Sequence, residues 1–182
     1  MRPHYFYTSV TRCSDLWSEP FDTRMLKRSD WATGDFVVGR VVGERNRLYE
    51  CETKTGRMAD LVRGDLLVGA LGKRAATLEG VGDWRATTDD LQLDALTSAG
   101  LLGRATSISP MLPELMRLEY LGHATRKDAK LNMADFVTPS PARPLEIPVI
   151  LVIGTSMSSG KTTSAQIIIR ALKYLGLDVV AD

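Results

Sequence analysis

The stretch from Pro148 to Asp182 constrains the fold of this chain more than any other part of the sequence. It opens with PVILVIG, an apolar, β-branched run of the kind found in strands that are buried on both faces of a parallel sheet. The helix formers of TTSAQIIIRALKYLG follow, and Gly176 stands where a helix would end. The final residues, LDVVAD, have the character of a second buried strand. This order predicts a βαβ unit.

The segment GTSMSSGKTT, which joins the first of these strands to the helix, has the composition of a phosphate-binding loop. Phosphate oxygens need converging backbone N–H groups, the positive end of a helix dipole and no obstructing side chains. Gly160 leaves the helix entrance open, and Lys161 is expected to lie along the β- and γ-phosphates as the catalytic cation. Thr162 would bind Mg²⁺ through its hydroxyl, and Thr163 would reach the α-phosphate. The predicted nucleotide-binding residues are Gly154, Thr155, Ser156, Met157, Ser158, Ser159, Gly160, Lys161, Thr162 and Thr163.

This loop departs from the usual G-x-x-x-x-G-K-[ST] pattern, because Thr155 stands five residues before Gly160 and the glycine, Gly154, lies one residue earlier. The alternative interpretation is a glycine–serine turn between a strand and a helix, with Lys161 only solvated. That alternative requires Gly160, Lys161, Thr162 and Thr163 to coincide with the helix start by chance. The phosphate-loop interpretation accounts for all four positions together.

The loop resembles the G-T-x-x-x-x-G-K-T loop of the dethiobiotin synthetase and cobyrinic acid amide synthase group of P-loop NTPases. It is also similar to the loop of predicted ATP-binding proteins that carry a small N-terminal domain. The resemblance covers only Val149 to Asp182. It implies ATP and Mg²⁺ as cofactors, with Gly160 and Lys161 on the phosphates and Thr162 on the metal, and it carries over no substrate.

An ATP-dependent enzyme that acts on a small molecule is the function we expect from this loop, as an ATPase, ligase or kinase. A non-enzymatic ATP-binding module that regulates assembly is the alternative. The N-terminal part would then recognise the substrate or a partner, or would serve only in oligomerisation. Since LDVVAD has no further strand after it, we also expect the nucleotide domain to be truncated in this chain, and this fragment alone to be inactive.

Short apolar runs broken by glycines dominate the region before the loop, and Asp35 to about Gly82 is expected to form a small barrel or sandwich. A hairpin turn is predicted at Gly43 to Asn46. Two helices are predicted to cover the β structure, one beginning at Thr88 or Asp89 and stopping at Gly100, the other beginning at Ser109 and ending at Gly122.

Four prolines in TPSPARPLEIP, Thr138 to Pro148, predict an extended linker. The expected organisation is therefore a β-rich domain with helices over residues 1–137, a linker over 138–148, and the first βαβ unit of a P-loop nucleotide-binding domain over 149–182. The predicted fold class is α/β, a barrel- or sandwich-like N-terminal domain followed by the start of a parallel P-loop domain.

Composition excludes several classes of partner. The chain has 23 Lys and Arg residues and 22 Asp and Glu residues, so its net charge creates no broad positive potential that would favour binding of nucleic acid or anionic lipid. The N-terminus lacks the apolar core of a signal peptide, and no run approaches the roughly 20 apolar residues of a membrane span. We therefore expect a cytoplasmic protein whose partners are a nucleotide and an unidentified small molecule, and a homo-oligomer is compatible with the sequence.

The remaining reactive side chains are expected to be structural. Cys13 and Cys51 lack neighbours at metal-ligand spacing and are predicted to be plain thiols. His123, beside Arg126, Lys127 and Lys130, is interpreted as part of a solvated basic loop, with an anion contact as the alternative.

Overall fold

The computed structural model describes residues 3–43, 50–76, 79–141, 144, 146–155 and 159–181. The chain divides into two compact units, the first comprising residues 1–75 and 79–139 and the second residues 76–78 and 140–182. The predicted turn at Gly43 to Asn46 falls largely on residues 44–49, which lie outside the described residues, as do Ser156, Met157, Ser158 and Asp182.

The first unit is built almost entirely from β-strands. Ten of them form one mixed sheet, and β4 pairs with β5 in a separate hairpin. The strands are β1 (Tyr5–Tyr7), β2 (Asp22–Arg24), β3 (Phe36–Val41), β4 (Cys51–Glu52), β5 (Met58–Ala59), β6 (Leu66–Leu71), β7 (Lys73–Ala76), β8 (Gly80–Asp83), β9 (Gln92–Ala95), β10 (Leu101–Ile108), β11 (Arg117–Arg126) and β12 (Ala129–Lys130). Four 3₁₀ turns connect them, η1 (Ser9–Cys13), η2 (Arg28–Asp30), η3 (Trp84–Ala86) and η4 (Met133–Phe136).

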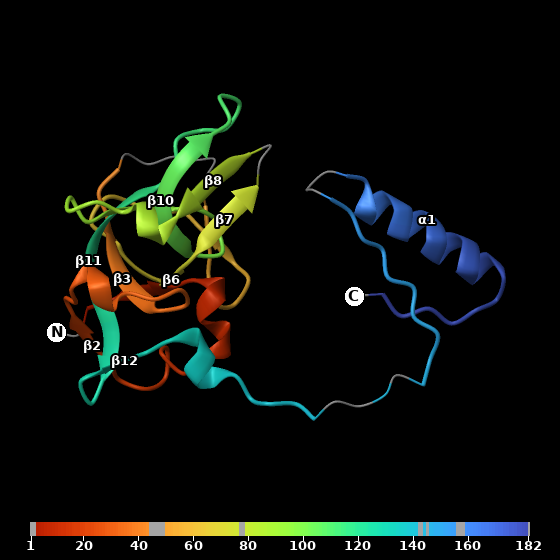
Figure 1. Ribbon diagram of the computed structural model, residues 1–182, viewed down its shortest axis with the longest axis horizontal. Coiled ribbons are helices and arrows are strands. Elements are labelled where there is room, and N and C mark those ends of the chain that lie inside the picture. Colours follow the sequence, from red (N-terminus) through yellow and green to blue (C-terminus); the bar gives the residue numbers. More distant parts are fainter. Residues whose placement is uncertain are drawn as a thin grey trace. The chain divides into compact units, whose positions relative to one another are not determined.

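Five strands of this sheet close into a barrel (Figure 1). The hydrogen-bonded cycle runs β6–β3–β11–β9–β10 and returns to β6. Four of its seams are antiparallel, whereas the closing seam between β10 and β6 is parallel and pairs Leu101 with Ala70 and Leu102 with Leu71. Closure leaves no exposed edge within the five-stranded cycle, which is how small all-β domains avoid unpaired backbone groups.

Side chains of β3 and β6 are buried on both faces of the barrel wall. Val37, Val41, Leu67 and Leu71 belong to the inner cluster, together with Trp31, Leu93, Leu102, Leu118 and Tyr120. The alternate residues Phe36, Val38, Val68 and Ala70 form an outer cluster, against which side chains of β1, η1 and η4 pack. Successive side chains of a strand point to opposite faces of the sheet. Because both faces of β3 and β6 are buried, these strands appear in the sequence as continuous apolar runs.

The predicted covering helices are not present, because each segment contributes a strand and irregular chain instead. Residues 92–95 form β9 and residues 117–126 form β11. The apolar residues that suggested the second helix were Leu115, Leu118 and Leu121, and of these only Leu118 is buried, on the same face of β11 as the inner-cluster residue Tyr120. Pro113 lacks the N–H that a helix starting at Ser109 would donate to the Ser109 carbonyl. Pairing with strands that are distant in the sequence thus outweighed the local helical pattern.

The predicted parallel α/β domain was also wrong. The structure is a mixed ten-stranded sheet with a single α-helix, α1 (Lys161–Tyr174), in the described part of the chain. Neither 148–154 nor the described residues 177–181 form a strand. An apolar β-branched run becomes a strand only when a neighbouring strand satisfies its backbone groups. Among the residues described in the second unit, no such neighbour lies beside either run, and Leu151 and Ile153 are 80% exposed.

Candidate functional site

The helix α1 begins directly after Gly160, which adopts the left-handed conformation with φ of 84° and ψ of 8°. A non-glycine residue would be strained in this conformation. No side chain caps the helix, and its first turn contains no acidic residue. No carboxylate of this turn therefore competes with a bound anion for the N–H groups and the positive end of the helix dipole.

The two ends of the predicted loop lie against each other. A Cβ atom added to Gly154 would overlap Ser159 Oγ and would lie 2.8 Å from Lys161 Cγ. The Lys161 ammonium donates a hydrogen bond of 3.4 Å to Ser159 Oγ. The structure thus brings Gly154, Ser159 and Lys161 together, and the absence of a side chain at Gly154 is what allows the approach.

The other predicted site residues do not take part in this contact. Thr162 and Thr163 are exposed in the first turn of α1, and Thr155 is exposed beside Gly154. Ser156, Met157 and Ser158 lie outside the described residues, so their predicted roles stay predictions. Within the described part of the chain, no group of three or more His, Cys, Asp or Glu residues could hold a metal ion. Thr162 would supply one hydroxyl oxygen to a magnesium ion at the loop.

A second concentration of polar side chains lies inside the barrel and was not expected from the sequence. Asp35 and His123 are both completely buried, and the carboxylate accepts a hydrogen bond of 3.2 Å from His123 Nε2. Asp35 also accepts hydrogen bonds from Lys130 Nζ at 2.8 Å, from Asn132 Nδ2 at 2.8 Å and from the backbone N–H of Ala32 at 2.6 Å. The prediction that His123 lies in a solvated loop was wrong.

The hydrogen-bond network continues from His123 to Tyr120. A carboxylate only accepts, so His123 donates from Nε2, and its Nδ1 shares a hydrogen bond of 2.6 Å with the Tyr120 hydroxyl. Tyr120 in turn accepts from the Leu26 N–H at 3.2 Å. Burial alone would raise the pKa of Asp35, but the hydrogen bonds from His123, Lys130, Asn132 and Ala32 outweigh it and hold that pKa below its ordinary value of 3.8.

A β-bulge explains why the sequence pattern did not reveal this network. Residues three apart on a regular strand point to opposite faces, yet Tyr120 and His123 contact each other. The register of β11 against β3 shifts between Tyr120 and Gly122, which turns His123 toward the interior. Gly122 was the one available signal, since an isolated glycine in a strand often marks a bulge. Both side chains of the Asp35–His123 pair are sealed from solvent, so we assign the network to stability rather than catalysis.

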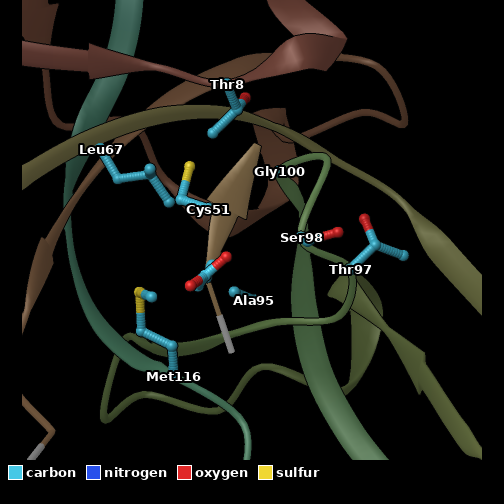
Figure 2. A pocket seen from close by; sticks show the side chains of 9 residues that line it. Thr8, Cys51, Leu67, Ala95, Thr97, Ser98, Gly100 and Met116 are labelled. Atoms are coloured by element: carbon cyan, nitrogen blue, oxygen red, sulfur yellow. The ribbon is translucent and has the colours of Figure 1, made fainter. Parts of the chain in front are cut away.

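An internal cavity of about 10 Å³ lies beside Cys51 and is lined by Thr8, Leu67, Thr97 and Met116 among others (Figure 2). This volume accommodates one water molecule at most. It is therefore too small for a substrate. Burial and, to a smaller extent, the charge of Glu52 raise the pKa of the Cys51 thiol to about 12, which excludes it as a nucleophile at neutral pH.

The two cysteines should consequently differ in reactivity. We expect a thiol-specific reagent at neutral pH to label Cys13, which is exposed, and to leave Cys51 unlabelled in the folded protein. Mass spectrometry after digestion would measure the two sites separately. The Cys13→Ser variant should take up no label until denaturant is added. Labelling of Cys51 at the rate of Cys13 would contradict the assigned burial.

Comparisons with protein-family models, with curated proteins and with solved structures found no match to this chain. None of the helices in the described residues has the length and apolar character needed to cross a membrane.

Proposed function

We propose that the segment Gly154–Thr163 binds the phosphates of a nucleoside triphosphate, with ATP as the expected ligand. The observation that carries the proposal is Gly160 in its left-handed conformation, directly before a fourteen-residue helix whose first residue is Lys161. Anions bind favourably at such a helix start. The close approach of Gly154 to Ser159 and Lys161 supports a compact loop, in which a larger residue at position 154 would take up the space.

Each residue of the loop has a distinct role in this proposal. The backbone N–H groups after Gly160 donate to phosphate oxygens, and the Lys161 ammonium neutralises charge on the β- and γ-phosphates. Thr162 would hold Mg²⁺ through its hydroxyl, and Thr163 would contact the α-phosphate. Bound Mg²⁺ would supply further neutralisation of the phosphate charge. The resemblance of this loop to that of the dethiobiotin synthetase and cobyrinic acid amide synthase group supports the same assignment.

We further propose that ATP binding serves an enzymatic reaction on a small molecule in the cytoplasm. A regulatory module whose nucleotide state controls assembly, including self-association, is the second candidate, because the protein then needs no residues for chemistry beyond the loop. Turnover of ATP by the full-length protein in the presence of small carboxylic acids or alcohols would favour an enzyme. Nucleotide-dependent association without turnover would favour the module.

The binding proposal is tested by titrating the full chain with a fluorescent ATP analogue and Mg²⁺. We expect Lys161→Ala to weaken binding by at least about tenfold, because hydrogen bonds to charged groups contribute about 1.5–3 kcal/mol each. Lys173→Ala, at the opposite end of the same helix, is the matched control and should leave the affinity unchanged. Equal binding by the wild-type protein and Lys161→Ala would refute the site.

A further inference from the structure

Two buried side-chain atoms in the described part of the chain have no hydrogen-bond partner among the protein atoms, Thr87 Oγ1 and Arg104 Nη1. Thr87 is only 1% exposed. Buried polar atoms in folded proteins nearly always have a partner, either another protein group or an ordered water molecule. A hydroxyl or guanidinium nitrogen that is buried without one destabilises the fold. The two atoms therefore indicate a ligand that the surrounding side chains do not supply.

Both residues lie beside the short segment from Trp84 to Leu91, whose two end residues pack against the inner cluster of the barrel. Thr87 directly follows η3 in this segment. Arg104 lies on β10 and is paired with Asp83, the residue just before η3. The segment and β10 are thus neighbours, and one buried unpaired atom belongs to each of them.

An ion pair connects the Arg104 side chain to the same segment. Arg104 Nη2 lies 3.5 Å from Asp90 Oδ2, and Asp90 Oδ1 accepts a hydrogen bond of 2.8 Å from the Thr88 hydroxyl. The guanidinium is therefore held close to residues 88–90, which directly follow Thr87. Its Nη1 atom is the part that this ion pair does not use.

The close approach of the backbone leaves room for only a small ligand here. A Cβ atom added to Gly103, next to Arg104, would lie 2.7 Å from the Trp84 nitrogen and 2.9 Å from the Asp83 carbonyl carbon. A ligand with several heavy atoms would have to separate η3 from β10. The ligand is also enclosed, because solvent does not reach either Thr87 Oγ1 or Arg104 Nη1.

The nearby charges favour a neutral ligand over an anion. Arg104 already has the Asp90 carboxylate at 3.5 Å. On the neighbouring strands, Arg117 Nε lies 3.9 Å from Asp94 Oδ1, so two carboxylates stand beside two guanidinium groups. An anion in contact with Arg104 would add a third negative charge to this balanced set.

We propose that one water molecule binds between the Thr87 hydroxyl and the Arg104 guanidinium and is a fixed part of the barrel. Water can accept from Arg104 Nη1 and can donate to, or accept from, the Thr87 hydroxyl. Globular proteins contain about one buried water per 27 residues, and each typically pairs polar groups that have no other partner. In this position the water joins the segment from Trp84 to Leu91 to β10.

The direct test is a water–protein NOE measurement on the complete chain with labelled threonine methyl groups. We expect a cross-peak between the Thr87 methyl group and a long-lived water. Thr88, the exposed next residue, is the matched control, and its methyl group should show no such cross-peak. Absence of the Thr87 cross-peak would overturn the proposal. A saturable shift of the Thr87 methyl resonance on titration with acetate would also overturn it, because a carboxylate would then occupy the site.

Substitution of Thr87 gives an independent measurement. Thr87→Val removes the hydroxyl at nearly constant volume, and we expect it to lower the thermal unfolding midpoint by about 2–6 °C through loss of one ordinary hydrogen bond. An unchanged or raised midpoint would show that the hydroxyl has no partner and would contradict the proposal. In an Arg104→Met background the same substitution should cost distinctly less, because the water has already lost its other partner. Equal costs in both backgrounds would mean that no ligand couples the two residues.

Discussion

Asp35→Ala is expected to lower the free energy of unfolding by about 3–5 kcal/mol, the range for removing one partner of a buried, hydrogen-bonded charge pair. The substitution would leave the buried His123 ring without its acceptor, and it would remove the acceptor that Lys130, Asn132 and the Ala32 N–H share at the partly exposed side of the network. Denaturant titration followed by tryptophan fluorescence would measure the loss, because Trp31 lies 5.5 Å from the His123 ring.

Asp89→Ala is the matched control for this substitution. Asp89 is fully exposed and its carboxylate lies 3.8 Å from the Arg28 guanidinium, so the unfolding free energy should stay close to that of the wild-type protein. A similar loss in both variants would show that the Asp35 network does not stabilise the barrel.

The same network predicts how stability depends on pH. Because the pKa of Asp35 is lower in the folded state, its contribution is fully present above the unfolded pKa near 4. It is lost as the pH falls through the lower pKa of the folded state. Asp35→Asn should therefore show a shallower decline in unfolding free energy than the wild-type protein below about pH 4. Parallel declines would contradict the assigned pKa shift.

Gly69→Ala is expected to destabilise the barrel by about 3 kcal/mol, at the upper end of the usual range for overpacking. An added Cβ would overlap the backbone carbonyl of Gly100 and would lie 2.9 Å from Leu102 at the closing seam. Backbone at this seam cannot move without disturbing the bonds from Ala70 N to Gly100 O and from Gly72 N to Leu102 O.

Gly80→Ala provides the comparison for this glycine substitution. A Cβ at Gly80 would have only ordinary contacts, 3.7 Å to Ser107 O and 3.8 Å to an Arg74 nitrogen. Its unfolding midpoint should thus stay close to that of the wild-type protein. Equal midpoints for Gly69→Ala and the wild-type protein would mean that β6 and β10 are not held together as tightly as described.

The sequence predicted local features better than their assembly. Gly160 and the helix that follows it were located from glycine and helix-former patterns, which act over a few residues. The predicted P-loop domain failed because PVILVIG and LDVVAD carry strand propensity, but propensity alone supplies no neighbouring strand. The predicted helix at 109–121 failed for a related reason, since β11 is stabilised by pairing with β3 some 80 residues earlier in the chain.

The same limit applies to the candidate sites. Lys161 and Thr162 could be proposed from adjacent residues, whereas Asp35 and His123 meet only after the bulge in β11 has changed the register. Pairings between distant segments are decided by the whole core and leave little local trace.

The central position of β11 has a consequence for synthesis of the protein. This strand pairs with β2, β3, β9 and β12, and the Asp35 carboxylate needs Lys130 and Asn132 from the residues just after it. The barrel thus cannot complete while the ribosome is still translating the first two-thirds of the chain. At about 5–20 residues per second, β3 waits roughly 4–16 s for β11. During that interval its apolar residues are available to chaperones, and a pause in translation before residue 117 would prolong the exposure.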